Sequence, residues 1–250
     1  QAAIAEAGLE PDFTTPPLPP DEWMRRWGAL PLMYQPGERW LYHVGYDVLS
    51  VLLARVTGQD LGAFLAERIF EPLGMQDTSF SVPPSKVDRL SACYRGEAAG
   101  LAVLDAGRDG PWARPVVFPS EVVSTADDYL KFGRMLLDLG RHAGGRLLAR
   151  PTVELMITDQ ITPEQKAISE FFPGFWDNQG WGMGVSIVNR RTGIAAVPGR
   201  FGWSGGLGTT FAVDPREDLV AVLLTQREQD PLVGKLYGDF MTLTYQAIDD

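Results

Sequence analysis

The stretch FGWSGGLGTTFAVDP, residues 201–215, joins a glycine-rich turn to an apolar segment. The β-branched and apolar runs at 208–214 and 219–225 predict two strands, and the charged link between them is typical of a hairpin. A third strand is predicted at 182–188, GMGVSIV. Apolar residues at helical spacing then predict a C-terminal helix, one face of which holds Leu232, Leu236, Phe240, Leu243 and Ala247.

Helical patterns dominate the chain before residue 180. One helix is predicted from the spacing of four residues, with Gly58 as its stop: Val48, Leu49, Leu52 and Val56. Further helices are predicted after an N-cap at Asp21, from Asp60, after Ser124 as a cap, and from Pro151. Helices followed by antiparallel strands indicate an α+β fold. We expect residues 1–180 to form a mostly helical region and residues 181–250 to supply the C-terminal strands and helix of the sheet region.

The composition restricts the classes of partner. The 250 residues carry a formal net charge of −10, which repels nucleic-acid phosphates. The one cysteine, Cys93, rules out an intrachain disulfide and is expected to be buried or half-buried. No apolar run approaches the roughly 20 residues that span a bilayer, so no membrane association is expected. His43 and His142 lie far apart without metal-ligand spacing, so neither a metal nor an organic cofactor is expected.

Ser204 stands in a G-x-S-x-G pattern, which in α/β-hydrolases presents a nucleophilic serine between a strand and a helix. In that fold the histidine follows the serine along the chain. Here His43 and His142 both precede Ser204, and a predicted strand follows it. We therefore expect the glycine-rich turn to serve another purpose than presenting a nucleophile.

Tyr42 lies in PGERWLYHVGYDVLSVLLARVTG, residues 36–58, just before a predicted helix. Spacing alone is compatible with a half-buried core tyrosine. A phenol is a poor base unless a cation favours its ionised form, but beside a lysine it could take a proton from a serine. The spacing leaves both interpretations open.

Four stretches together resemble the serine β-lactamase-like superfamily. They are residues 35–58, FLAERIFEPLGMQDTSFSVP at 64–83, VSTADDYLKFGRMLLDLG at 123–140, and the opening stretch at 201–215. They look most like its esterase branch, the family VIII carboxylesterases, beside class C β-lactamases and D-alanyl-D-alanine peptidases. The resemblance covers nearly the whole chain and implies a β-lactamase/transpeptidase-like fold, an antiparallel sheet flanked by helices. It also implies that Tyr42 is the catalytic tyrosine, acting as general base.

The superfamily's S-x-x-K motif, a serine and a lysine one helical turn apart, is absent from this chain. The residues three places before Lys86, Lys131, Lys166 and Lys235 are Pro83, Asp128, Pro163 and Leu232. In the family this motif lies upstream of the tyrosine, and the chain starts at Gln1 in a helix-like run. We expect the motif and the first strands of the sheet to lie upstream of this chain, either in a missing N-terminal part or in an N-terminal companion polypeptide, and without them we expect this chain to be inactive.

Two departures from class C β-lactamases bear on the substrate. Tyr42-His43-Val44 replaces Tyr-x-Asn, and Trp203-Ser204-Gly205 replaces Lys-Thr-Gly. Without the asparagine amide and the lysine charge, such a site favours uncharged acyl esters over anionic β-lactams. The resemblance implies that Trp203, Ser204 and Gly205 line the substrate pocket and that the N–H of Gly206 is an oxyanion donor. A core tryptophan is the alternative for Trp203.

The sequence thus predicts a serine esterase that cleaves small uncharged acyl esters through an acyl-enzyme. A β-lactamase or D-alanyl-D-alanine peptidase is the alternative within the enzymes, and a non-catalytic ligand-binding homologue is the alternative outside them. The acidic balance and the single cysteine favour a cytoplasmic location.

Overall fold

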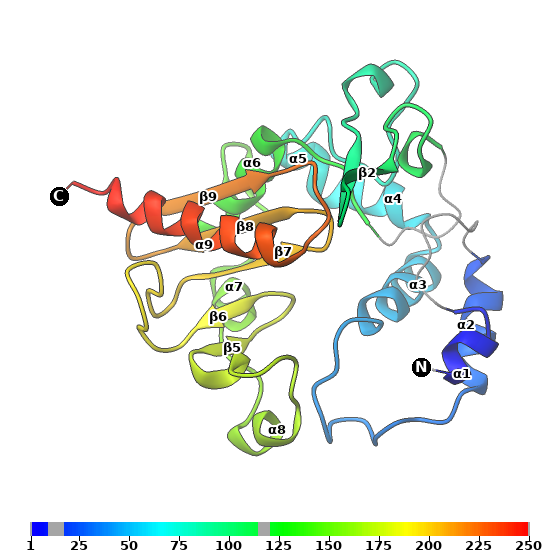
Figure 1. The fold of residues 1–250 in the computed structure, drawn as a ribbon, viewed down its shortest axis with the longest axis horizontal. Helices are drawn as coiled ribbons and strands as arrows, with labels where there is room; N and C mark the ends of the chain where they lie inside the picture. The colour runs from blue at the N-terminus through cyan, green and yellow to red at the C-terminus, as the bar shows by residue number, and fades with distance from the viewer. Residues whose placement is uncertain (1, 10–17, 115–120, 250) are drawn as a thin grey trace.

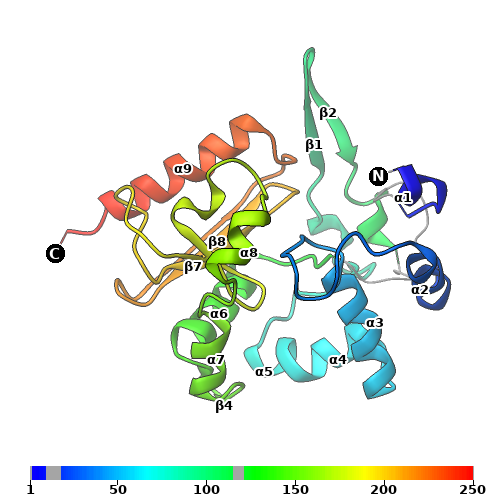
Figure 2. The same ribbon diagram turned by 90° about the horizontal axis from the view of Figure 1, so that it is seen from below.

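The computed structural model describes residues 2–9, 18–114 and 121–249. Figure 1 shows a five-stranded sheet with α9 on one face and α6 on the other, and a group of N-terminal helices to one side. Seen from below, α6 and α7 lie on the side of the sheet opposite α9 (Figure 2). This is the α+β architecture that the sequence predicts.

The sheet is antiparallel throughout, in the order β5-β6-β7-β8-β9. Its strands are β5 (Gln179–Trp181), β6 (Ser186–Val188), β7 (Phe201–Gly205), β8 (Thr209–Asp214) and β9 (Leu219–Leu224). Trp203 pairs with Phe211, and Ser204 pairs with Thr210. Because successive side chains of a strand point to opposite faces, Trp203 and Ser204 face opposite sides of the sheet.

Short helices and two small hairpins make up the rest of the described chain. The α-helices are α1 (Ala2–Glu6), α2 (Pro20–Ala29), α3 (Gly45–Thr57), α4 (Leu61–Leu65), α5 (Glu71–Leu73), α6 (Ala126–Leu137), α7 (Arg150–Met156), α8 (Pro163–Ile168) and α9 (Pro231–Gln246). A π-helical turn, Ala66–Phe70, links α4 to α5, and 3-10 turns occupy Val87–Arg89, Pro111–Ala113 and Phe175–Asp177. The hairpins are β1 (Cys93–Glu97) with β2 (Gly100–Asp105), and β3 (Arg141–His142) with β4 (Gly145–Arg146).

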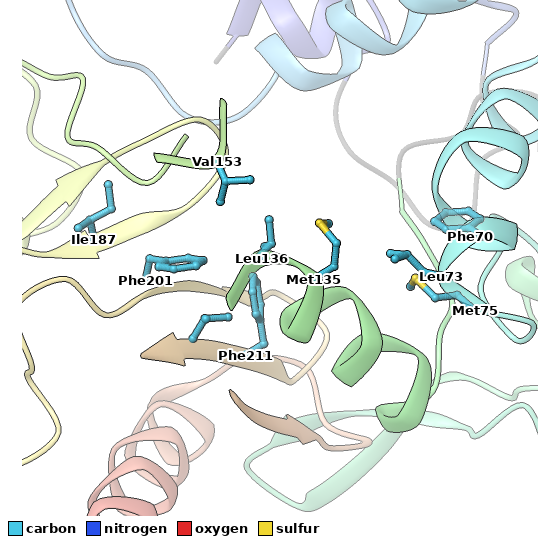
Figure 3. Packing of buried hydrophobic residues seen from close by; sticks show 10 residues of the cluster. Phe70, Leu73, Met75, Met135, Leu136, Val153, Ile187, Phe201 and Phe211 are labelled. Carbon is cyan, nitrogen blue, oxygen red and sulfur yellow. The ribbon is translucent and has the colours of Figure 1, made fainter. Parts of the chain in front are cut away.

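The main core lies between the sheet and α6. Met135 and Leu136 of α6 pack with Phe201 and Phe211 of the sheet, and Val153 of α7 extends the cluster (Figure 3). On its other side the cluster reaches the segment around α5 through Phe70, Leu73 and Met75. This core fixes β7, which borders the candidate site, against the helices.

Several helix starts differ slightly from prediction. Thr125, not Ser124, caps α6 by accepting a hydrogen bond from the Asp128 N–H at 3.2 Å, because the Ser124 hydroxyl is paired with that of Thr78 at 2.8 Å. The helix predicted after Asp21 begins at Pro20 without a side-chain cap. Asp60 does cap α4, through the N–H of Ala63 at 3.1 Å.

Two further differences concern burial and strand number. The sheet draws five strands from residues after 178, not three. Two short strands, β5 and β6, flank a turn at 182–185 where one strand was predicted, and β7 is an additional strand. The predicted stripe of α3 is exposed, with Leu52 at 53% and Val56 at 75% of their accessible surface, while Val51 is buried. The leucines of the predicted C-terminal stripe are likewise exposed, and α9 instead packs inward through Val233, Tyr237 and Tyr245.

Across residues 2–9, 18–114 and 121–249, no single helix is long and apolar enough to cross a membrane. The α3 helix and the helical stretch Leu61–Leu73 reach the length and apolar composition of a membrane span only when they are taken together, and a bend of 83° separates them.

Candidate active site

Tyr42 lies on an extended segment between a turn and the start of α3. Gly37 adopts a left-handed conformation (φ 80°), which suits glycine, and the Glu38 N–H donates to the Gln35 carbonyl at 3.0 Å. On the other side, the Tyr46 N–H donates to the carbonyl of His43 at 3.1 Å, which starts the first turn of the helix. The tyrosine is therefore held from both ends.

The segment is also tied to the loop that follows α8. The Trp40 N–H donates to the Ser169 hydroxyl at 3.0 Å, and Arg39 donates from Nη1 to the Ile168 carbonyl at 2.8 Å. The Gln165 side chain donates to the Gly37 carbonyl at 2.8 Å. These contacts join residues far apart in the sequence and place Tyr42 beside the sheet.

Tyr42 and Trp203 meet directly. The indole Nε1–H of Trp203 donates a hydrogen bond to the Tyr42 hydroxyl at 2.9 Å, and the ring centroids are 5.6 Å apart. Tyr42 keeps 38% of its accessible surface, so a substrate can reach it. The structure thus brings together two of the residues that the sequence assigned to the site.

An aromatic wall surrounds this pair. Trp181 packs edge-on against Trp203 at 4.6 Å, and Phe171 lies 5.3 Å from the Tyr42 ring and 6.0 Å from that of Trp203. Trp40 contacts four further rings, those of Phe171, Phe175, Trp176 and Trp181. The sequence reasoning missed this wall. The available signal was Trp40, two residues before Tyr42, with three tryptophans and four phenylalanines within 171–203.

Beyond Gly202, β7 has one free edge. The β6–β7 pairing ends at Ser186 opposite Gly202, so Trp203, Ser204 and Gly205 pair only with β8. Gly206 follows in the exposed turn, where its carbonyl accepts from the Gln229 N–H at 2.7 Å. Its own N–H has no acceptor among the described residues. Free N–H groups at such an edge are suited to binding a carbonyl oxygen.

The Ser204 side chain does not face Tyr42. Its hydroxyl donates to the Thr210 hydroxyl at 2.9 Å on the opposite side of the sheet from Trp203. Only the backbone of Ser204 lies along the same edge as the Trp203 backbone. Any contact of Ser204 with a substrate at that edge would therefore be made by main-chain atoms.

The lysines are all engaged elsewhere. Each makes an ion pair with an aspartate: Lys86 with Asp77, Lys131 with Asp128, Lys166 with Asp159, and Lys235 with Asp239. Near Tyr42, burial raises the pKa of the Asp47 carboxyl, and the charge of His43 partly offsets this rise. Across the described ranges, no three His, Cys, Asp or Glu side chains gather as metal ligands.

This fold, with a tyrosine beside the sheet strand that carries a tryptophan and two glycines, is that of the serine β-lactamases and their relatives. Residues 3–243 match the Beta-lactamase family model, and the chain belongs to this family. Protein Rv1367c of Mycobacterium tuberculosis is 36% identical over 223 residues, covering 84% of this chain and 54% of that protein. Lovastatin esterase of Penicillium rubens is 30% identical over 232 residues, covering 84% of this chain and 55% of that enzyme.

Among solved structures, EstCE1, a hydrolase with promiscuous acyltransferase activity, superposes with a TM-score of 0.81 at 21% identity. The match covers 97% of this chain and 66% of EstCE1, and it supports the β-lactamase/transpeptidase-like fold. The chain spans little more than half the length of the curated relatives it matches.

Proposed function

We propose that this chain supplies the general base and the substrate wall of a carboxylesterase that works through a serine acyl-enzyme. The observation that carries the proposal is the hydrogen bond from Trp203 to the Tyr42 hydroxyl beside the free edge of β7. The N–H donor fixes the position of the phenol oxygen, and a general base must lie within hydrogen-bond reach of the proton that it takes.

The serine and the lysine would come from residues outside 1–250 that carry S-x-x-K, on the same or on a companion polypeptide. None of the four lysines contacts Tyr42, because each pairs with an aspartate. The exposed stripe of α3 supports this part of the proposal: Val48, Leu49, Leu52 and Val56 form an apolar face on the helix that starts three residues after Tyr42. Exposed apolar faces of this kind are typical of interaction surfaces.

The reaction would run in two steps. Tyr42 takes the proton of the serine hydroxyl while the serine oxygen attacks the ester carbonyl, and the Gly206 N–H donates a hydrogen bond to the developing oxyanion. As the ester C–O bond breaks, Tyr42 returns the proton to the leaving alcohol. Water then repeats the sequence on the acyl-enzyme and releases the carboxylic acid.

The aromatic wall supports an uncharged acyl ester as the substrate. Trp203 stands where a class C β-lactamase has the lysine of its Lys-Thr-Gly motif, so no cation attracts a β-lactam carboxylate there. Phe171 and Trp181 add apolar surface on either side of Trp203. Esterase activity in lovastatin esterase, a relative at 30% identity, points the same way.

The test is a pair of assays on the reconstituted enzyme, meaning this chain together with the S-x-x-K polypeptide. We expect hydrolysis of p-nitrophenyl butyrate, little hydrolysis of nitrocefin, and no activity of residues 1–250 alone. Tyr42→Phe should lower kcat by about 10²- to 10⁴-fold, the range of a general base. Tyr34→Phe, which alters a tyrosine that stacks with Arg39 instead, serves as the control and should leave kcat unchanged.

The other outcomes separate the alternatives. Faster turnover of nitrocefin than of the ester would indicate a β-lactamase. Ligand binding without turnover and without labelling by a fluorophosphonate would indicate a non-catalytic homologue.

A further inference from the structure

The Asp159 carboxylate, in the loop between α7 and α8, binds donors from several elements. Its Oδ1 accepts hydrogen bonds from the N–H groups of Ile161 and Trp181, both at 3.1 Å. Its Oδ2 accepts from the Asn189 side chain at 2.9 Å and forms an ion pair with Lys166. A carboxylate has about four positions for donors, so all of them are occupied. The carboxylate therefore joins β5, the residue after β6, and α8.

The ion pair between Asp159 and Lys166 is largely enclosed. The two side chains keep 22% and 18% of their accessible surface, and Lys166 is the least exposed of the four lysines. A Cβ at Gly180 would overlap the Asp159 carboxylate, so a glycine at this position lets the carboxylate lie against β5. Burial acts to raise the pKa of Asp159, but Lys166 and the other donors outweigh it and hold the pKa below its usual value. Breaking an enclosed pair leaves a poorly solvated charge, which breaking an exposed pair does not.

The α8 helix connects this ion pair to the stretch that leads to Tyr42. The Lys166 ammonium also donates to the Gln179 carbonyl of β5 at 3.4 Å, so it fastens α8 to the strand. Three hydrogen bonds of 2.8–3.0 Å join residues 37–40 to residues within three positions of Lys166. Figure 1 shows α8 beside β5 and near the extended segment that runs into α3. The position of this segment therefore depends on where α8 is held.

The same carboxylate also fixes the aromatic wall. Trp181, whose N–H the carboxylate binds, packs edge-on against Trp203 at 4.6 Å. Phe171, in the loop after α8, contacts the rings of both Tyr42 and Trp203. The α8 helix has six residues, too few to be stable by itself, so its place depends on its tertiary contacts. A displacement of α8 would therefore change the surroundings of Tyr42 and Trp203 together.

We propose that Asp159 and Lys166 are positioning residues for Tyr42. Their ion pair holds α8 against β5, and α8 holds the Tyr42 hydroxyl at the Trp203 indole and in place for the serine. This inference rests on the proposed function for the reaction that Tyr42 catalyses, whereas the placement of the hydroxyl can be measured without turnover. Misplacing a reacting group by about 1 Å can lower a rate about 10²-fold, so a loosened α8 should lower kcat.

Lys166→Met tests the pair in the reconstituted enzyme. It removes the charge and keeps a side chain of similar length, while Asp159 retains three N–H donors. With p-nitrophenyl butyrate we expect kcat to fall at least about tenfold and KM to change less than about threefold. Asp159→Asn should lower kcat similarly. The double variant should lie within about threefold of the slower single variant, because both changes break one ion pair.

Two variants on α9 serve as controls. Lys235→Met breaks an exposed lysine–aspartate pair, and Val233→Ala removes buried methyl groups. The first controls for the loss of a charge and the second for the loss of stability. Both should leave kcat within about twofold of the wild type. A fall in kcat with Val233→Ala as large as that with Lys166→Met would overturn the proposal, and so would single effects that multiply in the double variant.

The indole N–H of Trp203 gives a readout that needs no turnover. With 15N-labelled tryptophan in this chain, its resonance in the reconstituted enzyme is assigned by its loss in Trp203→Phe. We expect Lys166→Met and Asp159→Asn each to shift this resonance by at least about half of the shift that Tyr42→Phe causes, and Lys235→Met to leave it in place. An unshifted resonance would overturn the proposal, whatever the effect on kcat. A shifted resonance in an enzyme that hydrolyses no ester would keep the positioning pair and reject the proposed esterase function.

Discussion

The indole N–H of Trp203 donates to the hydroxyl of Tyr42 over 2.9 Å, across 161 positions of sequence. The bond links the segment before α3 to the free end of β7, and it presents the tyrosine to solvent beside that edge. The donor fixes the position of the phenol oxygen at that edge. Trp203 is thus a positioning residue for the proposed base as well as a wall of the site.

Trp203→Phe keeps an aromatic ring and removes the donor. In the reconstituted enzyme we expect kcat to fall about tenfold, the effect of one hydrogen bond, with KM changed much less. Trp181→Phe, which alters a neighbouring ring that packs on Trp203, is the control. If both variants lower kcat equally, the hydrogen bond has no special role.

Ser204→Ala tests the direction of the serine side chain. Because its hydroxyl bonds to Thr210 on the far face of the sheet, we expect kcat/KM within about threefold of the wild type and a loss of about 1 kcal/mol in the free energy of unfolding. Steady-state kinetics and urea unfolding measure the two quantities. Loss of all activity would identify Ser204 as a nucleophile and reject the role given to the turn.

Phe171→Ala should widen the site. The ring lies 5.3 Å from Tyr42 and 6.0 Å from Trp203, so its removal opens space where an acyl chain would lie. We expect the ratio of kcat/KM for p-nitrophenyl octanoate over butyrate to rise roughly tenfold, as expected for added methylenes in an apolar pocket. Phe172→Ala, which alters the adjacent and more exposed ring, should leave the ratio unchanged. A rise in both variants would mean that the loop, not the Phe171 ring, limits acyl length.

Tyr237 should make the chain sensitive to alkaline pH. Burial raises its pKa to about 12, whereas an unfolded phenol titrates near about 10. The folded state keeps the phenol proton to a higher pH than the unfolded state does. The contribution of Tyr237 to the free energy of unfolding is therefore complete below pH ~10, and it is lost at about 1.4 kcal/mol per pH unit as the pH rises toward ~12.

Tyr237→Phe should remove this part of the decline. At neutral pH it should be neutral or stabilising, because it deletes a buried hydroxyl that has no partner among the described residues. Urea unfolding of both proteins between pH 8 and 11 is the measurement. Stability curves that stay parallel over this range would show that Tyr237 does not titrate as its burial implies.

The strands of the hairpin were predictable because continuous β-branched and apolar runs flank a charged link, and an extended strand has a side-chain period of two. Residues 208–214 and 219–225 differ from β8 and β9 by one terminal residue each. The same period places the side chains of Trp203 and Ser204 on opposite faces of the sheet. The sequence prediction, which assigned both residues to the lining of one pocket, did not take this alternation into account. Cys93 is buried, as expected.

The remaining features depend on tertiary contacts. The helical spacing of apolar residues predicted α3, but spacing does not determine which face of a helix packs against the rest of the protein. In the structure the predicted apolar stripe of α3 is exposed. Phe171 contacts Tyr42 from a loop, and Trp176 contacts Trp40 from a 3-10 turn. Neither segment has a periodic pattern, so only the folded chain shows these contacts.

The most direct test of the central claim is intact mass spectrometry of the reconstituted enzyme before and after treatment with a fluorophosphonate. We expect the added mass on the S-x-x-K polypeptide and an unmodified 27.5 kDa species for this chain. A label on this chain itself would contradict the account, and mapping it to Ser204 would place the nucleophile in the glycine-rich turn.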